Sequence, residues 1–339
     1  MLNKAADYRL ALLKSPNEIT KDSGILSNDG SRLFPNKGLD IRQICQAIYQ
    51  SGLVTEVLQA DLVLPDNIPP RPQPLHPFRK AVSKSYLKKI LNAYSSVGIP
   101  LILVIGVPNG PSYGLHAISV SGFKQLPPSP VATTPKISYY SDNIEKFYAH
   151  DDQWGPFARI EWHNDFEMIT EWNDATRRTY VLQIVIPTFP KIRISYHDIE
   201  VIVLGLDRIL TTTFGGKTIH DLVWDIKIDF SEKYKQNIIE LDPKVFPNKL
   251  KHLQKQLPKY VWAATCYIAD KPALKFIFDA TGLSQAMLGL DVLSFLPQEI
   301  TDQLITFLDA NQTNTTLVNV FGHTADEEYY QFFLKSLRS

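Results

Sequence analysis

One histidine and two adjacent aspartates are the residues in this sequence best suited to shared chemistry. His116 lies in the segment GLHAISVSGFK, and Asp151 and Asp152 end the later segment IEKFYAHDD. An imidazole can take a proton from a nucleophile and return it to a leaving group, while a carboxylate holds the ring in one orientation and tautomer. These residue types indicate general acid–base chemistry, with His116, Asp151 and Asp152 as candidate catalytic residues.

Two predicted strands have to bring these side chains together. Apolar patterns predict strands over residues 99–107, 114–124 and 144–151, and the proline-rich stretch QLPPSPVATTP predicts a loop between the last two. In an antiparallel pair, the start of one strand lies beside the end of the next. We therefore expect His116 to meet Asp151 or Asp152 at one edge of a sheet.

The order of these elements resembles that of papain-like cysteine peptidases of the bacteriocin-processing type. That family has a cysteine at the start of its first helix, a second helix after a Gly-rich turn, a strand with a histidine, and a strand that ends in aspartate. The second helix corresponds here to the segment GLDIRQICQAIYQSGL. His116 matches the family histidine, and Asp151 matches the orienting aspartate. The family follows that aspartate with proline, whereas this chain has Asp152, so either carboxylate could orient His116. The resemblance covers residues 1–160 and implies a papain-like domain with an antiparallel sheet.

The nucleophile of that family has no counterpart at the expected place. The family cysteine follows a glutamine that helps to form the oxyanion hole, but the first predicted helix here, residues 5–14, contains neither residue type, and no Cys or Gln precedes Gln43. Three interpretations follow. The chain is an inactive relative that binds something, the cysteine is encoded upstream of this sequence, or another residue substitutes for it.

The two cysteines of the sequence are poor substitutes. Cys45 lies within a predicted helix on the same face as Ile44 and Ile48, and Cys266 lies in the apolar segment YVWAATCYI. Cysteines in such positions are usually small buried hydrophobic residues. The sequence thus predicts a cysteine-peptidase-like protein that acts on or binds a peptide. It is a hydrolase if an upstream cysteine exists, and otherwise a non-catalytic interaction or scaffold protein.

Aromatic residues follow the two aspartates directly. Trp154 and Phe157 belong to a predicted turn, and their large rings make them candidate substrate-binding residues in a peptide-binding cleft. The same rings could instead form a hydrophobic plug that closes the edge of the sheet.

A metal site is a further alternative. His150, Asp151, Asp152, His163 and Asp165 lie within sixteen residues and offer the nitrogen and oxygen ligands of a hydrolytic metal centre. No ligand spacing such as HExxH occurs, and a polar loop after a strand accounts for the same residues. A metal-dependent hydrolase remains the less favoured alternative, and no metal or other cofactor is expected.

Composition sets the remaining expectations. The 339 residues are 44% hydrophobic and 21% charged with a net charge of zero, so the chain is globular and lacks the basic excess of a nucleic-acid-binding protein. Two cysteines, and no apolar segment of signal-peptide or membrane-spanning length, predict a cytoplasmic protein whose partner is a peptide or another protein rather than nucleic acid or a membrane.

The fold class predicted from these patterns is α+β, in two domains. Residues 1–170 form the peptidase-type domain and residues 171–339 an α+β domain of unknown role, with the boundary at the polar segment EWNDATRRT. Within the second domain, residues 261–268 and 273–278 predict a strand pair joined by the turn ADKP, and residues 283–295 predict packing helices or loops.

Overall fold

The computed structural model describes residues 14–23, 39–59, 81–127, 137–213, 222–243, 246, 248–282, 287–318 and 326–338, so nearly all of the helix predicted over residues 5–14 lies outside the described residues. The chain divides into two compact units, one of residues 1–126 and 144–190 and the other of residues 127–143 and 191–339. Helices and antiparallel strands occur in both units, which confirms the α+β class. No helix in the described part of the chain is long and apolar enough to cross a membrane.

The boundary between the units lies later than the sequence predicts. Strand β8 (Thr179–Thr188) pairs with β1 (Val54–Gln59) and β2 (Leu101–Asn109), so it belongs to the first unit. Residues 171–178 of the polar segment are consequently a loop within the first unit rather than a boundary. Its polar composition resembles that of a linker, and only the long-range pairing of β8 distinguishes the two.

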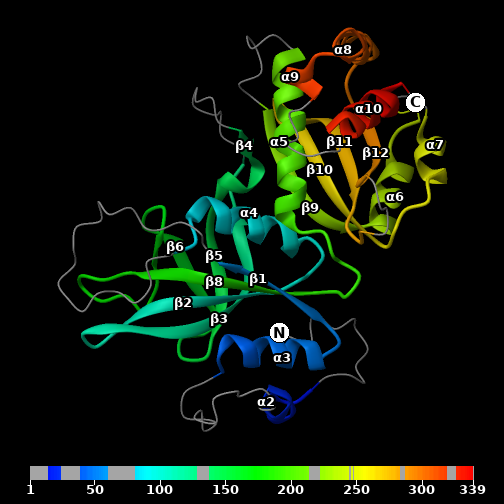
Figure 1. The fold of residues 1–339 in the computed structure, drawn as a ribbon. Helices are drawn as coiled ribbons and strands as arrows, with labels where there is room; N and C mark the ends of the chain where they lie inside the picture. The colour runs from blue at the N-terminus through cyan, green and yellow to red at the C-terminus, as the bar shows by residue number, and fades with distance from the viewer. Residues whose placement is uncertain are drawn as a thin grey trace. The chain divides into compact units, whose positions relative to one another are not determined.

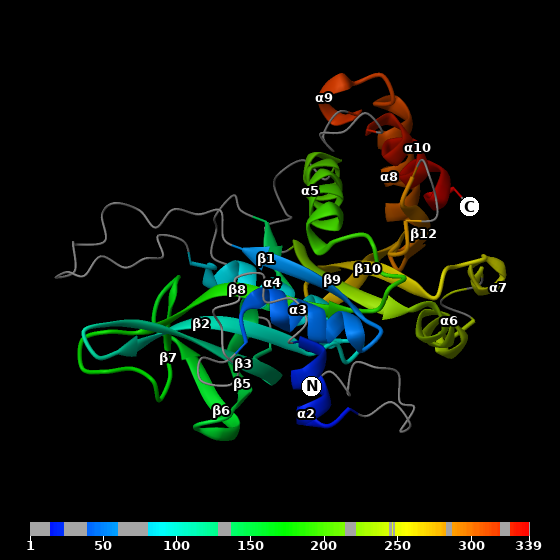
Figure 2. The same ribbon diagram turned by 60° about the horizontal axis from the view of Figure 1, so that its bottom comes forward.

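The first unit is an antiparallel sheet that curls until it closes (Figure 1). The strand order is β1-β8-β2-β3-β5-β6-β7, and β7 also pairs with β8, so all strands except β1 form a ring. Figure 2 shows β5, β6 and β7 gathered on the same side of β2 and β3. The other elements of this unit are α2 (Pro16–Ser23), α3 (Ile41–Gln50), α4 (Lys84–Ser95), β3 (Ser112–Gln125), β5 (Ile144–Asp151), β6 (Gly155–Trp162) and β7 (Glu167–Ile169).

Helix α3 covers one face of this sheet. It begins with a capping box, in which the Asp40 side chain accepts from the Gln43 amide and the Gln43 side chain accepts from the Asp40 amide, both at 2.9 Å. Its apolar side then packs against Ile102, Val104 and Val185. Residues directly opposite each other in an antiparallel pair share a face, so Ala117, opposite Val104, lies there too. We call this the α3 face.

The opposite face of the sheet carries the side chains of the alternate residues of β2 and β3. Leu103 and Ile105 of β2 lie opposite Ile118 and His116 of β3, so these four side chains share the face that we call the α4 face. Helix α4 lies on this side, because its Lys88 ammonium stands 5.5 Å from the ring centre of Trp162.

The Trp162 ring in turn contacts Phe147 at 5.3 Å between centroids, and Phe147 shares the face of Ala149 and its partner Val120. Figure 1 shows α3 and α4 on opposite sides of the sheet.

The second unit is a second antiparallel sheet with helices on both faces. Its strand order is β12-β11-β10-β9-β4, with the short β4 parallel to β9. Its elements are β4 (Ser138–Tyr139), the 3-10 helix η3 (Tyr140–Asn143), α5 (Tyr196–Thr213), β9 (Leu222–Phe230), α6 (Ser231–Glu240), α7 (Lys249–Gln254), β10 (Tyr260–Ile268), β11 (Lys271–Asp279), β12 (Gly289–Ser294), α8 (Gln298–Ala310), α9 (Thr315–Val318) and α10 (Asp326–Leu337).

Two predictions for the second unit have different outcomes. The strand pair joined by ADKP is confirmed as β10 and β11, and Ala269 and Asp270 both take the positive φ angles, 46° and 60°, of a tight two-residue turn. The helix or loop predicted over residues 283–295 is wrong for its second half, because residues 289–294 form β12 against β11. A short apolar run does not distinguish a strand from a helix when the pairing partner is unknown.

A buried ionic cluster joins α6, α7 and β12. The fully buried Asp291 carboxylate accepts from the Tyr234 hydroxyl and the Lys255 ammonium, both at 2.6 Å, and contacts Nδ1 of His252 at 2.9 Å. Burial, the largest single influence, raises the pKa of Asp291, but the bonds from His252, Lys255 and Tyr234 outweigh it and lower the pKa below its usual value.

This cluster gives a first prediction. Asp291→Ala should lower the free energy of unfolding by about 3–5 kcal/mol, because His252, Lys255 and Tyr234 lose their shared buried acceptor. Urea denaturation measures the change, and hydrogen exchange in β10 and β12 assigns it to the second unit. Asp302→Ala, on the exposed side of α8, is the matched control and should change the stability by less than about 0.5 kcal/mol. Equal stability of the two variants would contradict the prediction.

Candidate functional site

His116 and Asp151 meet on neighbouring strands of the first unit. His116 is the fifth residue of β3 and Asp151 the last of β5, and the register pairs Ser119 with His150. The two side chains are therefore diagonal neighbours, and Nε2 of His116 lies 3.2 Å from Oδ2 of Asp151. The structure thus brings together the pair that the sequence predicts.

The Asp151 carboxylate is buried and accepts hydrogen bonds on both oxygens. Oδ1 accepts from the amides of Gln153 at 2.8 Å and Trp154 at 3.1 Å, and Oδ2 accepts from the indole N–H of Trp172 at 2.8 Å. Burial, the largest single influence, raises the pKa of Asp151. The bonds from Trp172, Gln153 and Trp154, with the charge of His116, outweigh it, so the pKa lies below its usual value.

Asp152 plays a lesser part in the geometry. Its Oδ1 lies 3.3 Å from Nε2 of His116, but its side chain is 78% exposed, whereas that of Asp151 is 4% exposed. An exposed carboxylate gains little from such a contact because water screens it. Of the two aspartates, Asp151 is the one that makes the hydrogen bond and is itself held in place.

The ionised Asp151 determines which nitrogen of His116 carries the proton. A carboxylate without a proton only accepts, so Nε2 must donate, and the neutral ring then has its lone pair on Nδ1. The described residues supply no hydrogen-bond partner to Nδ1. Nδ1 is therefore the nitrogen that is available to accept a proton.

Trp172 completes the site and was not identified from the sequence. Besides its bond to Asp151, its ring lies 4.6 Å from the His116 ring between centroids and 5.9 Å from the Trp154 ring. Its loop is fixed by Asn173, whose side chain accepts from the Thr179 amide at 2.8 Å and donates to the Met168 carbonyl at 3.0 Å. The sequence signal that indicates Trp172 is a large aromatic residue inside the otherwise polar segment EWNDATRRT.

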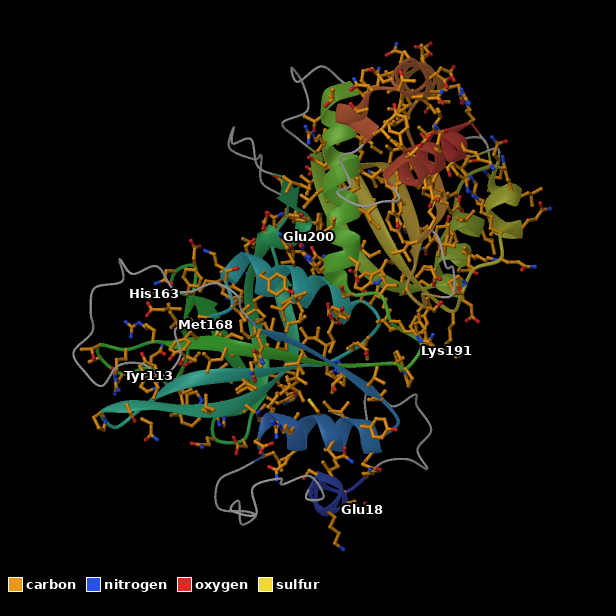
Figure 3. The ribbon with its side chains drawn as sticks, in the orientation of Figure 1. Glu18, Tyr113, His163, Met168, Lys191 and Glu200 are labelled. Atoms are coloured by element: carbon orange, nitrogen blue, oxygen red, sulfur yellow. The ribbon has the colours of Figure 1, made fainter. Side chains whose placement is uncertain are left out.

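Elements far apart in the sequence meet at this end of the first unit. Tyr113 and Met168 lie at the same end of the unit (Figure 3). Tyr113 is three residues before His116, and Met168 begins the segment that leads to Trp172.

Trp154 and Phe157 are both exposed, 50% and 65% accessible, but they lie on different sides of β5. The Trp154 ring contacts Trp172 beside the pair, whereas the Phe157 ring lies 5.1 Å from His150, whose side chain points to the face opposite Asp151. The turn predicted to include Trp154 and Phe157 ends sooner than expected, because β6 begins at Gly155. Between the pairs Ala149–Ala158 and Asp151–Gly155, β6 has one residue more than β5, which makes a β-bulge. Phe157 lies in the bulge with φ 62°, a left-handed conformation that costs a residue with a side chain about 1–2 kcal/mol.

A narrow pocket lies beside the buried carboxylate. Its lining comes from β2, β3, β5, β6 and the loop after β7, and includes Ile105, Ile118, Asp151, Trp154, Arg159 and Trp172. Its free volume is about 10 Å³, which is room for about one water molecule, so the pocket as described does not hold a side chain.

Neither cysteine can serve His116. Cys45 belongs to α3, which packs on the α3 face, while His116 points to the α4 face, so the sheet separates them. Cys266 is fully buried in the second unit, and burial raises the pKa of its thiol above the usual range. The sequence holds no other cysteine.

The residues of the metal alternative do not gather as a group. His150 is exposed and its ring lies against Phe157 at 5.1 Å, and Asp165 forms an ion pair with Lys84 at 3.6 Å. Among the described residues, the group whose ligand atoms come close enough to hold a cation is His116, Asp151 and Asp152, within 4.8 Å of one another. The histidine that joins the two aspartates is thus His116, not His150 or His163.

Comparison with known proteins gives no relative. No protein-family model, no curated protein and no solved structure matches this chain.

The support of Asp151 by Trp172 gives a second prediction. Trp172→Phe should raise the pKa of Asp151 and lower the stability by about 1.5–3 kcal/mol, because a buried carboxylate loses one charge-assisted hydrogen bond. The stability that Asp151 adds is complete above the unfolded pKa of about 3.9 and is lost as the pH falls through its lower folded pKa. In Trp172→Phe this loss should be smaller and should be complete at a higher pH, because the folded pKa of Asp151 lies closer to the unfolded one. Carboxyl-carbon NMR titration and unfolding at several pH values measure both changes.

Trp154→Phe is the control, since only the backbone amide of Trp154 reaches Asp151. The prediction fails if the two variants titrate alike.

Proposed function

We propose that the first unit is a papain-like, peptidase-type domain that binds a peptide beside His116 and Asp151, and that neither cysteine of the chain gives it thiol catalysis. The observation that carries the proposal is the hydrogen bond of 3.2 Å from His116 to a buried, ionised Asp151. This hydrogen bond fixes the His116 ring and directs Nδ1 away from the carboxylate. The pair resembles the arrangement of the catalytic base and the residue that orients it in cysteine peptidases.

The surroundings of the pair favour a peptide as the ligand. One exposed ring, that of Trp154, lines the pocket that reaches Asp151. Exposed aromatic side chains bury a large area on binding at a small cost in conformational entropy. A peptide offers apolar side chains for the Trp154 ring and backbone N–H groups that can donate to Nδ1 of His116.

Peptide hydrolysis would require a thiol that this sequence does not place beside His116. Nδ1 could deprotonate such a thiol if a residue outside this sequence supplied it. With the two cysteines given, the domain is a binding module that keeps the acid–base pair. Both cysteines are free thiols, which suits the cytoplasmic location that we propose.

A metal-dependent hydrolase is the weaker candidate for the same residues. The distances of 3.2 and 3.3 Å from Nε2 of His116 to the two carboxylates would also suit a shared cation. However, the Asp151 oxygens already accept from two amides, an indole and His116, which uses the lone pairs that a cation would need. The hydrogen-bonded pair accounts for the geometry without a cation.

Thiol labelling gives a third prediction. Iodoacetamide should alkylate Cys45 at the same rate in the wild type and in His116→Ala, because the sheet separates the two side chains, and should reach Cys266 only after unfolding. Mass spectrometry of each cysteine over time measures the rates. His150→Ala, an exposed histidine on β5, is the matched control. A fall of about a hundredfold in His116→Ala alone, the size of a general-base effect, would show that His116 activates a thiol and would contradict the proposal.

Metal analysis gives a fourth prediction. Titration of the metal-free protein with Zn²⁺ or Mn²⁺ should show no stoichiometric binding that depends on His116, because Asp151 has no lone pair to spare. Isothermal titration of the wild type, His116→Ala and Asp152→Ala measures it. Tight binding of one cation that both His116→Ala and Asp152→Ala abolish would instead establish the metal site.

A further inference from the structure

We infer that Lys275, on the side of the second sheet that α6 covers, is a nucleophilic amine that forms an imine with a small 2-oxo acid. The proposed peptide binding uses the first unit alone, so this inference goes beyond it. A lysine attacks a carbonyl carbon only in its neutral form. Three features of Lys275 favour that form or make it accessible: its apolar neighbours, its partly exposed side chain and the charges around it.

The neighbours of Lys275 on the sheet are partly apolar. Lys275 lies in the middle of β11, opposite Thr265 of β10 on one side and Leu293 of β12 on the other. Its ammonium group stands 5.7 Å from the ring centre of Tyr234, which belongs to α6. Leu293 and Tyr234 are both members of the buried apolar cluster between α6 and the sheet. The nitrogen therefore lies beside an apolar region, which disfavours its charged form.

Part of Lys275 still reaches the surface. The residue is intermediate in exposure, neither buried nor fully open. Because β11 pairs with a strand on each side, its backbone is covered, and the exposed part belongs to the side chain. A lysine in such a position lays its aliphatic stem over apolar residues and extends its nitrogen toward water, so a small reagent can approach it.

The surrounding charges leave Lys275 without a counter-charge of its own. The Lys227 ammonium lies 2.8 Å from the Asp225 carboxylate, and the Lys233 ammonium lies 3.5 Å from the Asp229 carboxylate. Among the residues that the structure describes, no hydrogen bond or ion pair reaches the Lys275 nitrogen, whose one close contact is the Tyr234 ring. With Lys275 protonated, the group has three positive charges and two negative ones, so this proton adds an unbalanced charge.

These surroundings lower the pKa of Lys275. Burial is the largest cause. The charges of Asp229 and Asp225 raise the pKa and those of Lys233 and Lys227 lower it, with a result below the usual value. At neutral pH a larger fraction of Lys275 than of an exposed lysine is therefore the neutral amine. Desolvation and neighbouring ammonium groups are the two means by which proteins make a lysine nucleophilic.

Imine formation fits this charge balance when the carbonyl compound carries a carboxylate. The neutral amine attacks the carbonyl carbon, a C–N bond forms, and one proton moves from nitrogen to oxygen. The C–O bond then breaks, and the hydroxyl group leaves as water with one proton from solvent, which gives a protonated imine. The carboxylate of a 2-oxo acid balances this positive charge, whereas an uncharged aldehyde leaves it unbalanced in a partly buried place.

Reductive trapping on the full chain tests this inference. Glyoxylate, the smallest 2-oxo acid, is added with cyanoborohydride, and mass spectrometry follows the carboxymethylation of each lysine over time. At neutral pH we expect Lys275 to react at least about threefold faster than Lys271, the exposed lysine at the start of the same strand, although Lys275 is the less accessible of the two. Because its pKa is lower, the rate at Lys275 should also stop rising at a lower pH than the rate at Lys271.

A second reagent tests the class of substrate. Acetaldehyde lacks the carboxylate and should prefer Lys275 over Lys271 less strongly than glyoxylate does. A rate at Lys275 that equals or falls below the rate at Lys271 with glyoxylate would overturn the inference. An equal preference with the two reagents would overturn the assignment to 2-oxo acids. Both comparisons are made within the wild-type protein, so neither depends on the folding of a variant.

A substitution on α6 tests the part played by the neighbouring charges. Lys233→Gln removes one ammonium group and frees Asp229 to act on Lys275, so the rate at Lys275 should fall while the rate at Lys271 stays the same. The Lys233 side chain is 55% exposed, so this variant should fold, and circular dichroism checks that it does. An unchanged rate at Lys275 would contradict the charge argument on which the inference rests.

Discussion

An ionised carboxylate at the end of a strand, largely shielded from water, has to find hydrogen-bond donors within the protein, and the site of this protein is built around that requirement. Asp151 meets it with two amides of its own turn, the indole of Trp172 and the imidazole of His116. Removing any of these donors would leave part of the charge without a hydrogen bond and would lower the stability by about 1–3 kcal/mol. The closed sheet, with β7 joined to β8, holds the loop that brings Trp172 to this position.

The alternation of side chains along β3 then decides what His116 can reach. Its neighbours on the α4 face are Ile105 and Ile118, and the turn after Asp151 supplies Trp154. The alternate residues of the strands form the α3 face, on which the helix that carries Cys45 packs. A one-residue change of register would exchange the two faces, so the separation of Cys45 from His116 follows from strand pairing rather than from side-chain details.

The sequence contains enough information for part of this account. The strand at Ile144–Asp151 and the pairing of His116 with Asp151 follow from the apolar patterns of two successive strands, although residues 126–143, nearly all of them in the second unit, connect the two. The position of Trp172 does not, because it depends on β8 returning to pair with β1 and β2, a contact between distant segments. For the same reason the sequence alone indicates a domain boundary at the polar segment 171–179, of which residues 171–178 are a loop within the first unit. The bulge that exposes Phe157 depends on a register between strands that no local pattern specifies.

The tautomer of His116 is the most direct measure of this arrangement. Long-range nitrogen–proton NMR spectra of protein with ¹⁵N-labelled histidine, assigned with His116→Gln, report which ring nitrogen carries the proton. The account predicts that neutral His116 carries it on Nε2, with an unprotonated Nδ1, and that Asp151→Asn weakens this preference while His150→Ala does not. A neutral His116 protonated on Nδ1 in the wild type would contradict it, because Nε2 would then have no proton to donate to Asp151.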